Sequence, residues 1–319
     1  MLKYLLLADG HFSNTLCPQE IEAIVRTASR LLGKGSSGAK KIARYYDDKR
    51  LTHMAGTFKQ AGSCGPFDGL ISLGDNFYDW ENFGLGSAGT AEEARELKHR
   101  LLDYLSLHGK QHIWVPGNHE LGYLNSSLSP RGPSLPAADN YYHYRDVYGP
   151  TCGIKRLNDC YSMIWISTAN IENLFAYPDT INDEKNIFLA AQEDEELEFL
   201  SWTLDHLKGK FFLAVHDPGS FLSPKLAMIL DNHIGKLAGS FCGHFHADWL
   251  LKLAKIYRQD FRNAFQLYKI QFIPSIWGVV LPFLFKTSGA GWARLDIDDK
   301  RAELWQYRSG IKDAKRFVL

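Results

Sequence analysis

The sequence predicts an α/β fold in which the sheet arrangement is mixed. Short apolar runs recur along the 319-residue chain, and most end in glycine, aspartate, asparagine or histidine. Such bounded runs are typical of buried strands. Segments with helical periodicity lie between them, and strands that alternate with helices indicate an α/β protein. Residues 291–308 alternate apolar and polar side chains around an Asp-Asp-Lys turn, which predicts an antiparallel hairpin.

Five of the apolar runs predict strands with chemically active residues directly after them. In chain order, these runs occupy residues 4–8, 69–73, 112–116, 211–215 and 239–242. In open α/β sheets, ligands bind at the carboxyl ends of the strands. Polar residues that follow strand after strand therefore predict one shared site.

Four segments predict helices. Residues 17–33 have a proline near the start, early acidic residues and a terminal glycine. Residues 193–209 likewise begin with acidic residues and end with a glycine. Residues 90–109 have Thr90 as the N-cap, an acidic first turn and Gly109 as the stop. Residues 248–268 space their apolar side chains as one amphipathic helix that covers the sheet.

Composition narrows the class of protein. Lysine plus arginine and aspartate plus glutamate each number 36, so there is no strong nucleic-acid signature. Five scattered cysteines do not form a disulfide framework; Cys152 and Cys160 could bridge a loop, but reduced thiols are favoured.

Two apolar stretches could be taken for a signal peptide or a transmembrane segment, but both are too short. The first apolar run is too short for a signal peptide, and Pro274 and Pro282 interrupt the longest run, residues 270–285. We therefore expect a cytoplasmic protein without a transmembrane segment.

The residues at the strand ends are those that bind divalent metals. Carboxylates, neutral imidazoles and an amide oxygen are all suitable ligands. They are Asp9, His11, Asp75, Asn118, His119, His216, His244 and His246. Residues i and i+2 of an extended chain face the same way about 6.5–7 Å apart, and the ions of two-metal sites lie about 3.5–4 Å apart. His244 and His246 can therefore contact different ions, and Asp75 is the natural bridging carboxylate.

Five short sequences in order resemble those of the calcineurin-like metallophosphoesterase superfamily. They are DGH, GDNFYD, GNHE, VHDP and GHFH, between residues 9 and 246. The resemblance implies a four-layer α-β-β-α sandwich with two mixed sheets and a dinuclear metal site at the strand ends. It also implies one domain over residues 1–319, with insertions near residues 33–66, 122–160 and 249–290.

The resemblance also implies a role for each residue. Asp9, His11, Asp75 and His246 would hold one divalent ion, and Asp75, Asn118, His216 and His244 would hold another; Mn, Zn, Fe and Mg are the candidates. A water between the ions would become acidic enough to attack phosphorus as hydroxide. His119 would not bind metal but would protonate the leaving oxygen or stabilise charge on the phosphoryl group.

Departures from the pattern distinguish branches of the superfamily. The chain lacks the Asp-Arg-Gly continuation of protein Ser/Thr phosphatases. GDNFY is similar to purple acid phosphatases, whose tyrosine at the position of Tyr78 binds iron, but those enzymes have glycine where this chain has His11. Tyr78 is therefore expected beside the metal ligands instead of among them, and Asp79 or Glu120 would orient His119. The region after residue 270 is similar to acid-sphingomyelinase-like phosphodiesterases.

The expected function is metal-dependent hydrolysis of a phosphomonoester or phosphodiester. The substrate would be a phosphorylated small molecule, a nucleotide or a lipid-like compound, and neither substrate nor oligomeric state follows from the sequence. The alternative is a non-catalytic scaffold of the same fold. The tyrosine cluster could stack on a substrate, although packing within a loop is favoured. Residues 277–285 could form a lid, contact lipid or be buried. The tyrosines are Tyr141, Tyr142, Tyr144 and Tyr148.

Overall fold

The architecture comes from a computed structural model of the chain. The structure describes residues 1–10, 55–76, 91–118, 120–121, 138–167, 183–245, 248–276, 279–281, 286–288, 290–308 and 313–319. The helix predicted over residues 17–33 lies outside these ranges. All five predicted strands and the C-terminal hairpin are confirmed.

The described strands form two main sheets. The first has the order β13-β12-β11-β1-β2-β3. Its strands are β1 (Leu2–Leu7), β2 (Gly69–Ser72), β3 (Gln111–Trp114), β11 (Gly291–Ile297), β12 (Ala302–Arg308) and β13 (Lys315–Val318). β1, β2 and β3 are parallel, whereas β11, β12 and β13 each pair antiparallel with a neighbour, so this sheet is mixed.

The second main sheet has the order β4-β5-β6-β7-β8. Its strands are β4 (Gly153–Arg156), β5 (Tyr161–Trp165), β6 (Lys210–Ala214), β7 (Leu237–Cys242) and β8 (Ile270–Phe272). Only β4 is antiparallel to its neighbour. A separate two-stranded ribbon consists of β9 (Val279–Leu281) and β10 (Lys286–Ser288).

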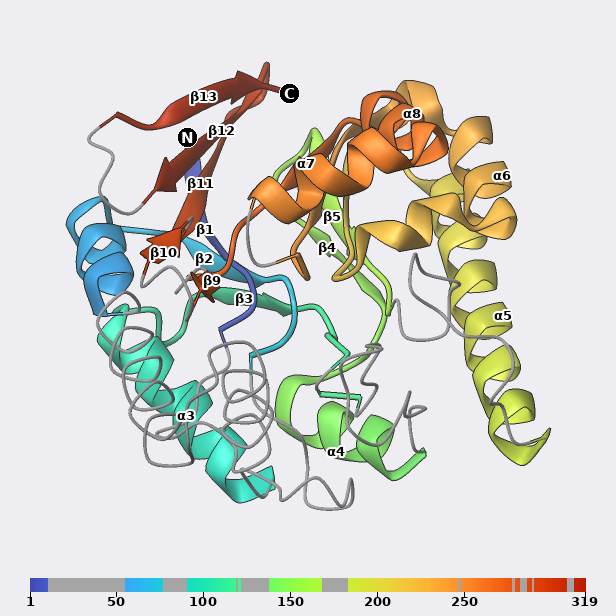
Figure 1. The fold of residues 1–319 in the computed structure, drawn as a ribbon, viewed down its shortest axis with the longest axis horizontal. Coiled ribbons are helices and arrows are strands. Elements are labelled where there is room, and N and C mark those ends of the chain that lie inside the picture. The colour runs from blue at the N-terminus through green and yellow to red at the C-terminus, as the bar shows by residue number, and fades with distance from the viewer. Residues whose placement is uncertain are drawn as a thin grey trace, which may run out of the picture.

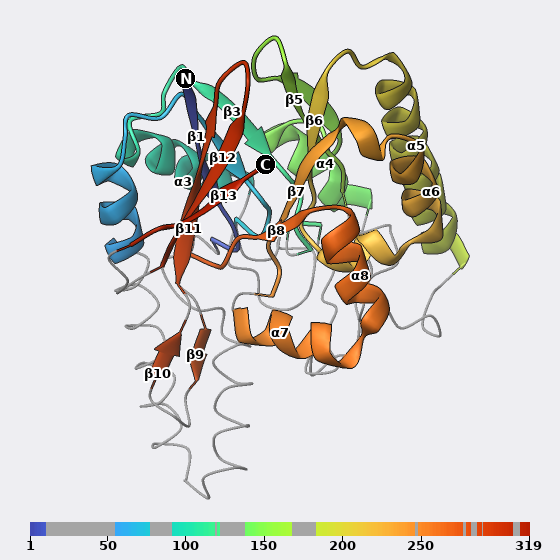
Figure 2. The ribbon, with the colours of Figure 1, turned by 90° about the horizontal axis from the view of Figure 1, so that it is seen from above.

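Helices cover the outer faces of both sheets, which gives four layers (Figures 1 and 2). Residues 55–63 form a helix on the first sheet. The others are α3 (Ala91–Tyr104), α4 (Ala138–Tyr148), α5 (Asp183–His206), α6 (Pro224–Asn232), α7 (Asp248–Tyr257) and α8 (Gln259–Leu267), with 3-10 turns η3 (Pro218–Leu222) and η4 (Ile234–Lys236). In the described part of the chain, every helix is too short or too polar to span a bilayer.

The parallel strands are apolar on both faces because both faces are buried. In β1, Leu6 packs between the two sheets while Leu5 and Leu7 pack under the outer helices. In β6, Phe212 points between the sheets and Phe211 points outward. Side chains of a strand alternate between faces, so a continuous apolar run marks a strand that is covered on both sides.

The helix predicted over residues 90–109 ends earlier, at Tyr104. Ser106 has φ 54°, and the N–H of Leu107 donates to the carbonyl of Leu102 over 2.8 Å. The N–H of Ser106 donates to the carbonyl of Asp103, which completes a Schellman motif with Ser106 in the left-handed position. Gly109 therefore belongs to the following turn and does not stop the helix.

The helix predicted over residues 248–268 is divided at Arg258. Arg258 has φ −126° and ψ 102°, so α7 ends before it and α8 begins after it. The guanidinium of Arg258 bonds the Asp260 carboxylate through Nε and Nη2 at 3.0 and 2.6 Å. Phe261 and Phe265 of α8 then pack into the core beside the second sheet.

Parts of the predicted insertions contribute to the fold. β4 lies within residues 122–160 and forms one edge of the second sheet, while β8 lies within residues 249–290 and forms the other edge. Phe58 and Ala61 of the 55–63 helix are buried against the first sheet. These segments therefore do more than connect strands.

Candidate metal centre

The carboxyl ends of five parallel strands carry the candidate metal ligands. Asp9 follows β1, Asp75 follows β2 and Asn118 follows β3 in the first sheet. His216 follows β6 and His244 follows β7 in the second sheet. Hydrogen bonds and ion pairs connect these five residues, so the two sheets jointly form a single polar cluster.

Three of the five residues have a left-handed backbone. The φ angles are 49° for Asp9, 51° for Asp75 and 72° for His244. Residues other than glycine adopt this conformation infrequently, and departures of this kind concentrate at functional sites. The sharp turn after each strand directs its side chain across the end of the sheet.

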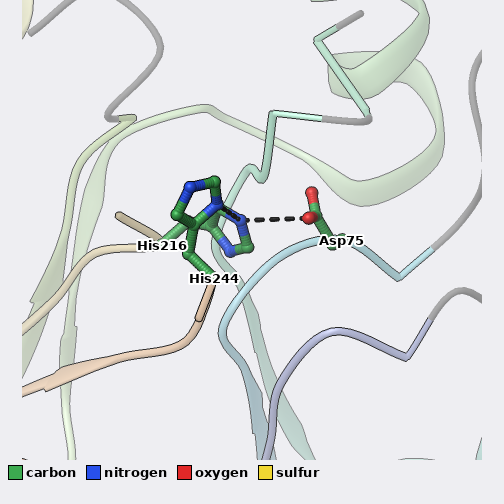
Figure 3. Close-up of side chains that lie close together, drawn as sticks. All are labelled: Asp75, His216 and His244. Carbon is green, nitrogen blue, oxygen red and sulfur yellow. Dashed lines mark hydrogen bonds and ion pairs between the residues drawn. The ribbon is translucent and has the colours of Figure 1, made fainter. Parts of the chain in front are cut away.

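The donor atoms of the cluster surround Nε2 of His216. This nitrogen lies 3.1 Å from Oδ2 of Asp75 and 3.0 Å from Oδ1 of Asn118. Nδ1 of His244 lies 3.1 Å from both Nε2 of His216 and Oδ1 of Asn118. Figure 3 shows Asp75, His216 and His244 pointing toward one another. Two oxygens and two imidazole nitrogens therefore converge on one point.

This donor set fits a divalent cation. Metal–ligand bonds to imidazole nitrogen and carboxylate oxygen are about 2.0–2.2 Å, so adjacent ligands at right angles lie about 3 Å apart. The separations of 3.0–3.1 Å have this size. One carboxylate, one amide oxygen and two imidazoles also match the preference of Zn²⁺ and similar ions for mixed nitrogen and oxygen ligands.

Electrostatics within the cluster also favour a positive charge. His216 is fully buried, which by itself lowers its pKa. The adjacent Asp75 carboxylate and the more distant Asp9 carboxylate outweigh burial and raise that pKa well above the ordinary value for histidine. The same negative groups would attract a metal ion, which would take the place of the proton on Nε2.

Asp9 lies beside the cluster and is held to it by backbone hydrogen bonds. Its carboxylate accepts the N–H of His244 at 3.0 and 3.1 Å, and its own N–H donates to the carbonyl of Gly74. A Cβ on Gly243 would lie 2.8 Å from Oδ2 of Asp9, so this close approach requires glycine. Asp9 is therefore fixed between the two sheets.

Glu120 holds the turns of the first sheet together. Its Oε2 accepts the N–H groups of Asp75 and Gly117, each at 2.9 Å, and its Oε1 accepts the N–H of Asn76. Burial and the nearby Asp75 carboxylate raise the pKa of Glu120 to about 7, although His216 and the N–H donors act in the opposite direction. These contacts give Glu120 the task of positioning Asp75, which the sequence does not indicate.

Replacing Gly117 by alanine is expected to disturb this arrangement. The new Cβ would lie 2.2 Å from both N and Oδ1 of Asp75. Such overpacking costs about 1–3 kcal/mol, so we expect lower resistance to urea and a reduced metal content. Gly62→Ala is the control, because Gly62 has no atom within 4 Å of its Cβ position. Gly117→Ala protein with wild-type stability and full metal content would contradict this account.

Several predicted site residues lie outside the described residues. These are His11, Tyr78, Asp79, His119 and His246. Their roles stay predictions.

Most of the tyrosine cluster packs in the interior, as predicted, but it lies on helix α4 and not in a loop. Tyr141 and Tyr144 of α4 are buried, and the Tyr144 hydroxyl donates to the carbonyl of Trp114 over 2.7 Å. The Tyr148 ring contacts the Trp114 ring at an interplanar angle of 42°, whereas Tyr142 is exposed. Packing therefore accounts for three of the four tyrosines.

Cys152 and Cys160 are both free thiols.

Three solved structures are similar to this chain at very low sequence identity. Vps29 of Entamoeba histolytica in complex with Zn²⁺ is 10% identical, with a TM-score of 0.34 over 100% of this chain and 98% of the other. GAP50, the anchor in the inner membrane complex of Plasmodium, is 11% identical, with a TM-score of 0.47 over 100% and 88%. Vps29 of Chaetomium thermophilum is 9% identical, with a TM-score of 0.34 over 100% and 95%. No curated protein sequence matches the chain.

The sequence profile of the calcineurin-like phosphoesterases matches residues 3–248. This range begins in β1 and ends just after β7, so it includes all five strand ends of the candidate metal centre. The chain therefore belongs to the calcineurin-like phosphoesterase family.

Proposed function

We propose that the protein hydrolyses a phosphomonoester or phosphodiester at a centre that binds two divalent metal ions. The observation that carries this proposal is the convergence of Asp75, Asn118, His216 and His244, with donor atoms 3.0–3.1 Å apart. These residues come from four strand ends of two sheets, and packing alone gives no reason for four such donors to meet in the interior.

The second ion would be held by a second set of residues that shares Asp75 with the first. Asp9 lies next to this cluster, and its carboxylate accepts the N–H of His244. We assign His11 and His246 to this ion together with Asp9 and Asp75. Asp75 would then contact both ions, because its carboxylate has two oxygens.

Bound divalent ions lower the pKa of water and neutralise charge on a phosphoryl group. The chain itself supplies a buried, preorganised frame for that chemistry, since Glu120 and the Asp9–His244 bond fix the strand-end turns. We assign His119, between Asn118 and Glu120 in sequence, to proton donation to the leaving oxygen or to stabilisation of phosphoryl charge. Asp79 and Tyr78 would lie beside the metal ligands without binding metal. The whole chain, residues 1–319, would form one domain.

A direct test uses the purified protein with nitrophenyl phosphomonoesters and phosphodiesters. We expect turnover that requires added Mn²⁺ or Zn²⁺, two equivalents of bound metal per chain, and loss of turnover after treatment with a chelator. If two equivalents bind but no phosphoester is turned over, the alternative function as a binding scaffold is correct. If no metal binds, the proposed centre is wrong.

A further inference from the structure

One buried carboxylate beside the cluster has no assigned role in metal binding. Asp217 directly follows His216 at the end of β6, and only 3% of the residue is exposed. Its Oδ2 lies 3.8 Å from Nε2 of His244. This is an ion-pair distance, about 1 Å longer than a hydrogen bond. A single strand end therefore provides a candidate ligand, His216, and a carboxylate that faces the ligand of the neighbouring strand.

The two ring nitrogens of His244 face different surroundings. Nδ1 points to Asn118 and His216, at 3.1 Å from each partner atom, whereas Nε2 points to Asp217. A neutral imidazole carries one proton, and the nitrogen without the proton is the one that binds metal. A carboxylate next to Nε2 stabilises the proton there and leaves Nδ1 available.

We propose that Asp217 is a positioning residue that fixes the ring and the tautomer of His244, so that Nδ1 is presented to the metal ion. This inference rests on the metal centre of the proposed function. Histidine ligands of metals generally donate their other N–H to a carboxylate, a carbonyl or water. Asp217 is placed to be that acceptor for His244.

The other oxygen of Asp217 has a structural task that keeps the side chain in place. Oδ1 accepts the N–H of Gly219 at 2.7 Å and caps η3. The hydroxyl of Ser220 donates to the Asp217 carbonyl over 2.8 Å. The turn thus fixes the side chain through Oδ1, with Oδ2 at 3.8 Å from Nε2 of His244.

The cap and the charge can be separated by one substitution. Asparagine caps helices about as well as aspartate does, but its amide carries no charge to stabilise the Nε2–H tautomer. We expect Asp217→Asn to keep the unfolding midpoint of the metal-free protein. Its affinity for Zn²⁺ at the His244 site should fall about 10–100-fold, the usual effect of removing such a partner. Affinity is measured by competition with a chromophoric chelator.

Ser223→Ala is the matched control for capping. Ser223 caps α6 through the N–H of Leu226 at 3.5 Å and is next to η3. Its loss should lower stability by about 1 kcal/mol without changing Zn²⁺ affinity. Unchanged Zn²⁺ affinity in Asp217→Asn would overturn the inference. Absence of Zn²⁺ binding by the wild-type protein would instead overturn the proposed function.

A second measurement needs no stable variant at position 217. Nitrogen-15 spectra of wild-type protein labelled on its histidines report the tautomer of each ring, and a His244→Gln sample identifies the His244 signal. We expect His244 to carry its proton on Nε2, with Nδ1 shifting when Zn²⁺ is added. A proton on Nδ1 in the metal-free protein would refute the role of Asp217.

Discussion

Asp75→Asn protein is expected to lose phosphoesterase activity by about 10³-fold and to bind less metal than the wild type. Asp75 is almost completely buried, and its Oδ2 lies 3.1 Å from Nε2 of His216. In the proposed centre Asp75 would help to hold both ions, so its negative charge would contribute to the binding of both. A metal ion supplies several kcal/mol of transition-state stabilisation, and each 1.36 kcal/mol is about a tenfold change in rate.

The measurement combines kcat/KM for a nitrophenyl phosphoester with the number of bound metal equivalents. Asparagine has nearly the same shape, and the backbone N–H of residue 75 keeps its bond to Glu120, so the fold should survive. Asp260→Asn is the control, because that carboxylate lies on the surface of α8 and pairs with Arg258. If Asp75→Asn protein binds two equivalents of metal and has the wild-type kcat/KM, the assignment of Asp75 as the bridging ligand is wrong.

The strand ends of the site can be predicted from sequence because they depend on local pattern. An apolar run followed by Asp75 or His216 indicates both a strand and the edge of the sheet where the residue lies. That the two sheets place these residues within hydrogen-bonding distance does not follow from the pattern alone. The resemblance to the family was needed to predict two facing sheets.

Features that depend on distant contacts could not be predicted. Glu120 bonds the backbone of Asp75, 45 positions away, and the Asp9 carboxylate bonds the N–H of His244, 235 positions away. Asp217 lies in the sequence VHDP, yet only the position of its Oδ2 near His244 distinguishes it from an ordinary helix cap. An acidic residue directly after a candidate ligand is the signal that could have identified it.

Errors in the predicted helices have the same origin. Glycine is the usual residue at a helix end, so Gly109 is the natural stop, but Ser106 adopts the left-handed conformation and ends α3 first. Leu107 is buried beyond that turn, which stabilises the early end. At Arg258, the apolar spacing continues through a break in the helix, after which Phe261 and Phe265 of α8 are buried in the core. Tertiary packing overrides local preference in both places.

His119→Ala protein is expected to keep both metal ions and to lose activity on an alkyl phosphoester by about 10²–10⁴-fold, the usual scale for acid–base catalysis. The residues on either side of His119 already have other tasks. Oδ1 of Asn118 lies in the ligand cluster, and the Glu120 carboxylate bonds three backbone N–H groups. Removal of the imidazole should therefore leave those tasks intact. A metal content that falls with activity would place His119 among the ligands.

The dependence of this loss on the leaving group separates the two roles proposed for His119. A proton donor matters most when the leaving oxygen is strongly basic, because such an oxygen must be protonated as the bond breaks. The loss should then be large for an alkyl phosphoester and small for a nitrophenyl phosphoester. If His119 instead stabilises charge on the phosphoryl oxygens, the loss should be equal for both substrates, because those oxygens are the same in each. Measuring kcat/KM for both substrates in wild type and His119→Ala therefore assigns the role, since a difference between the two losses indicates proton donation.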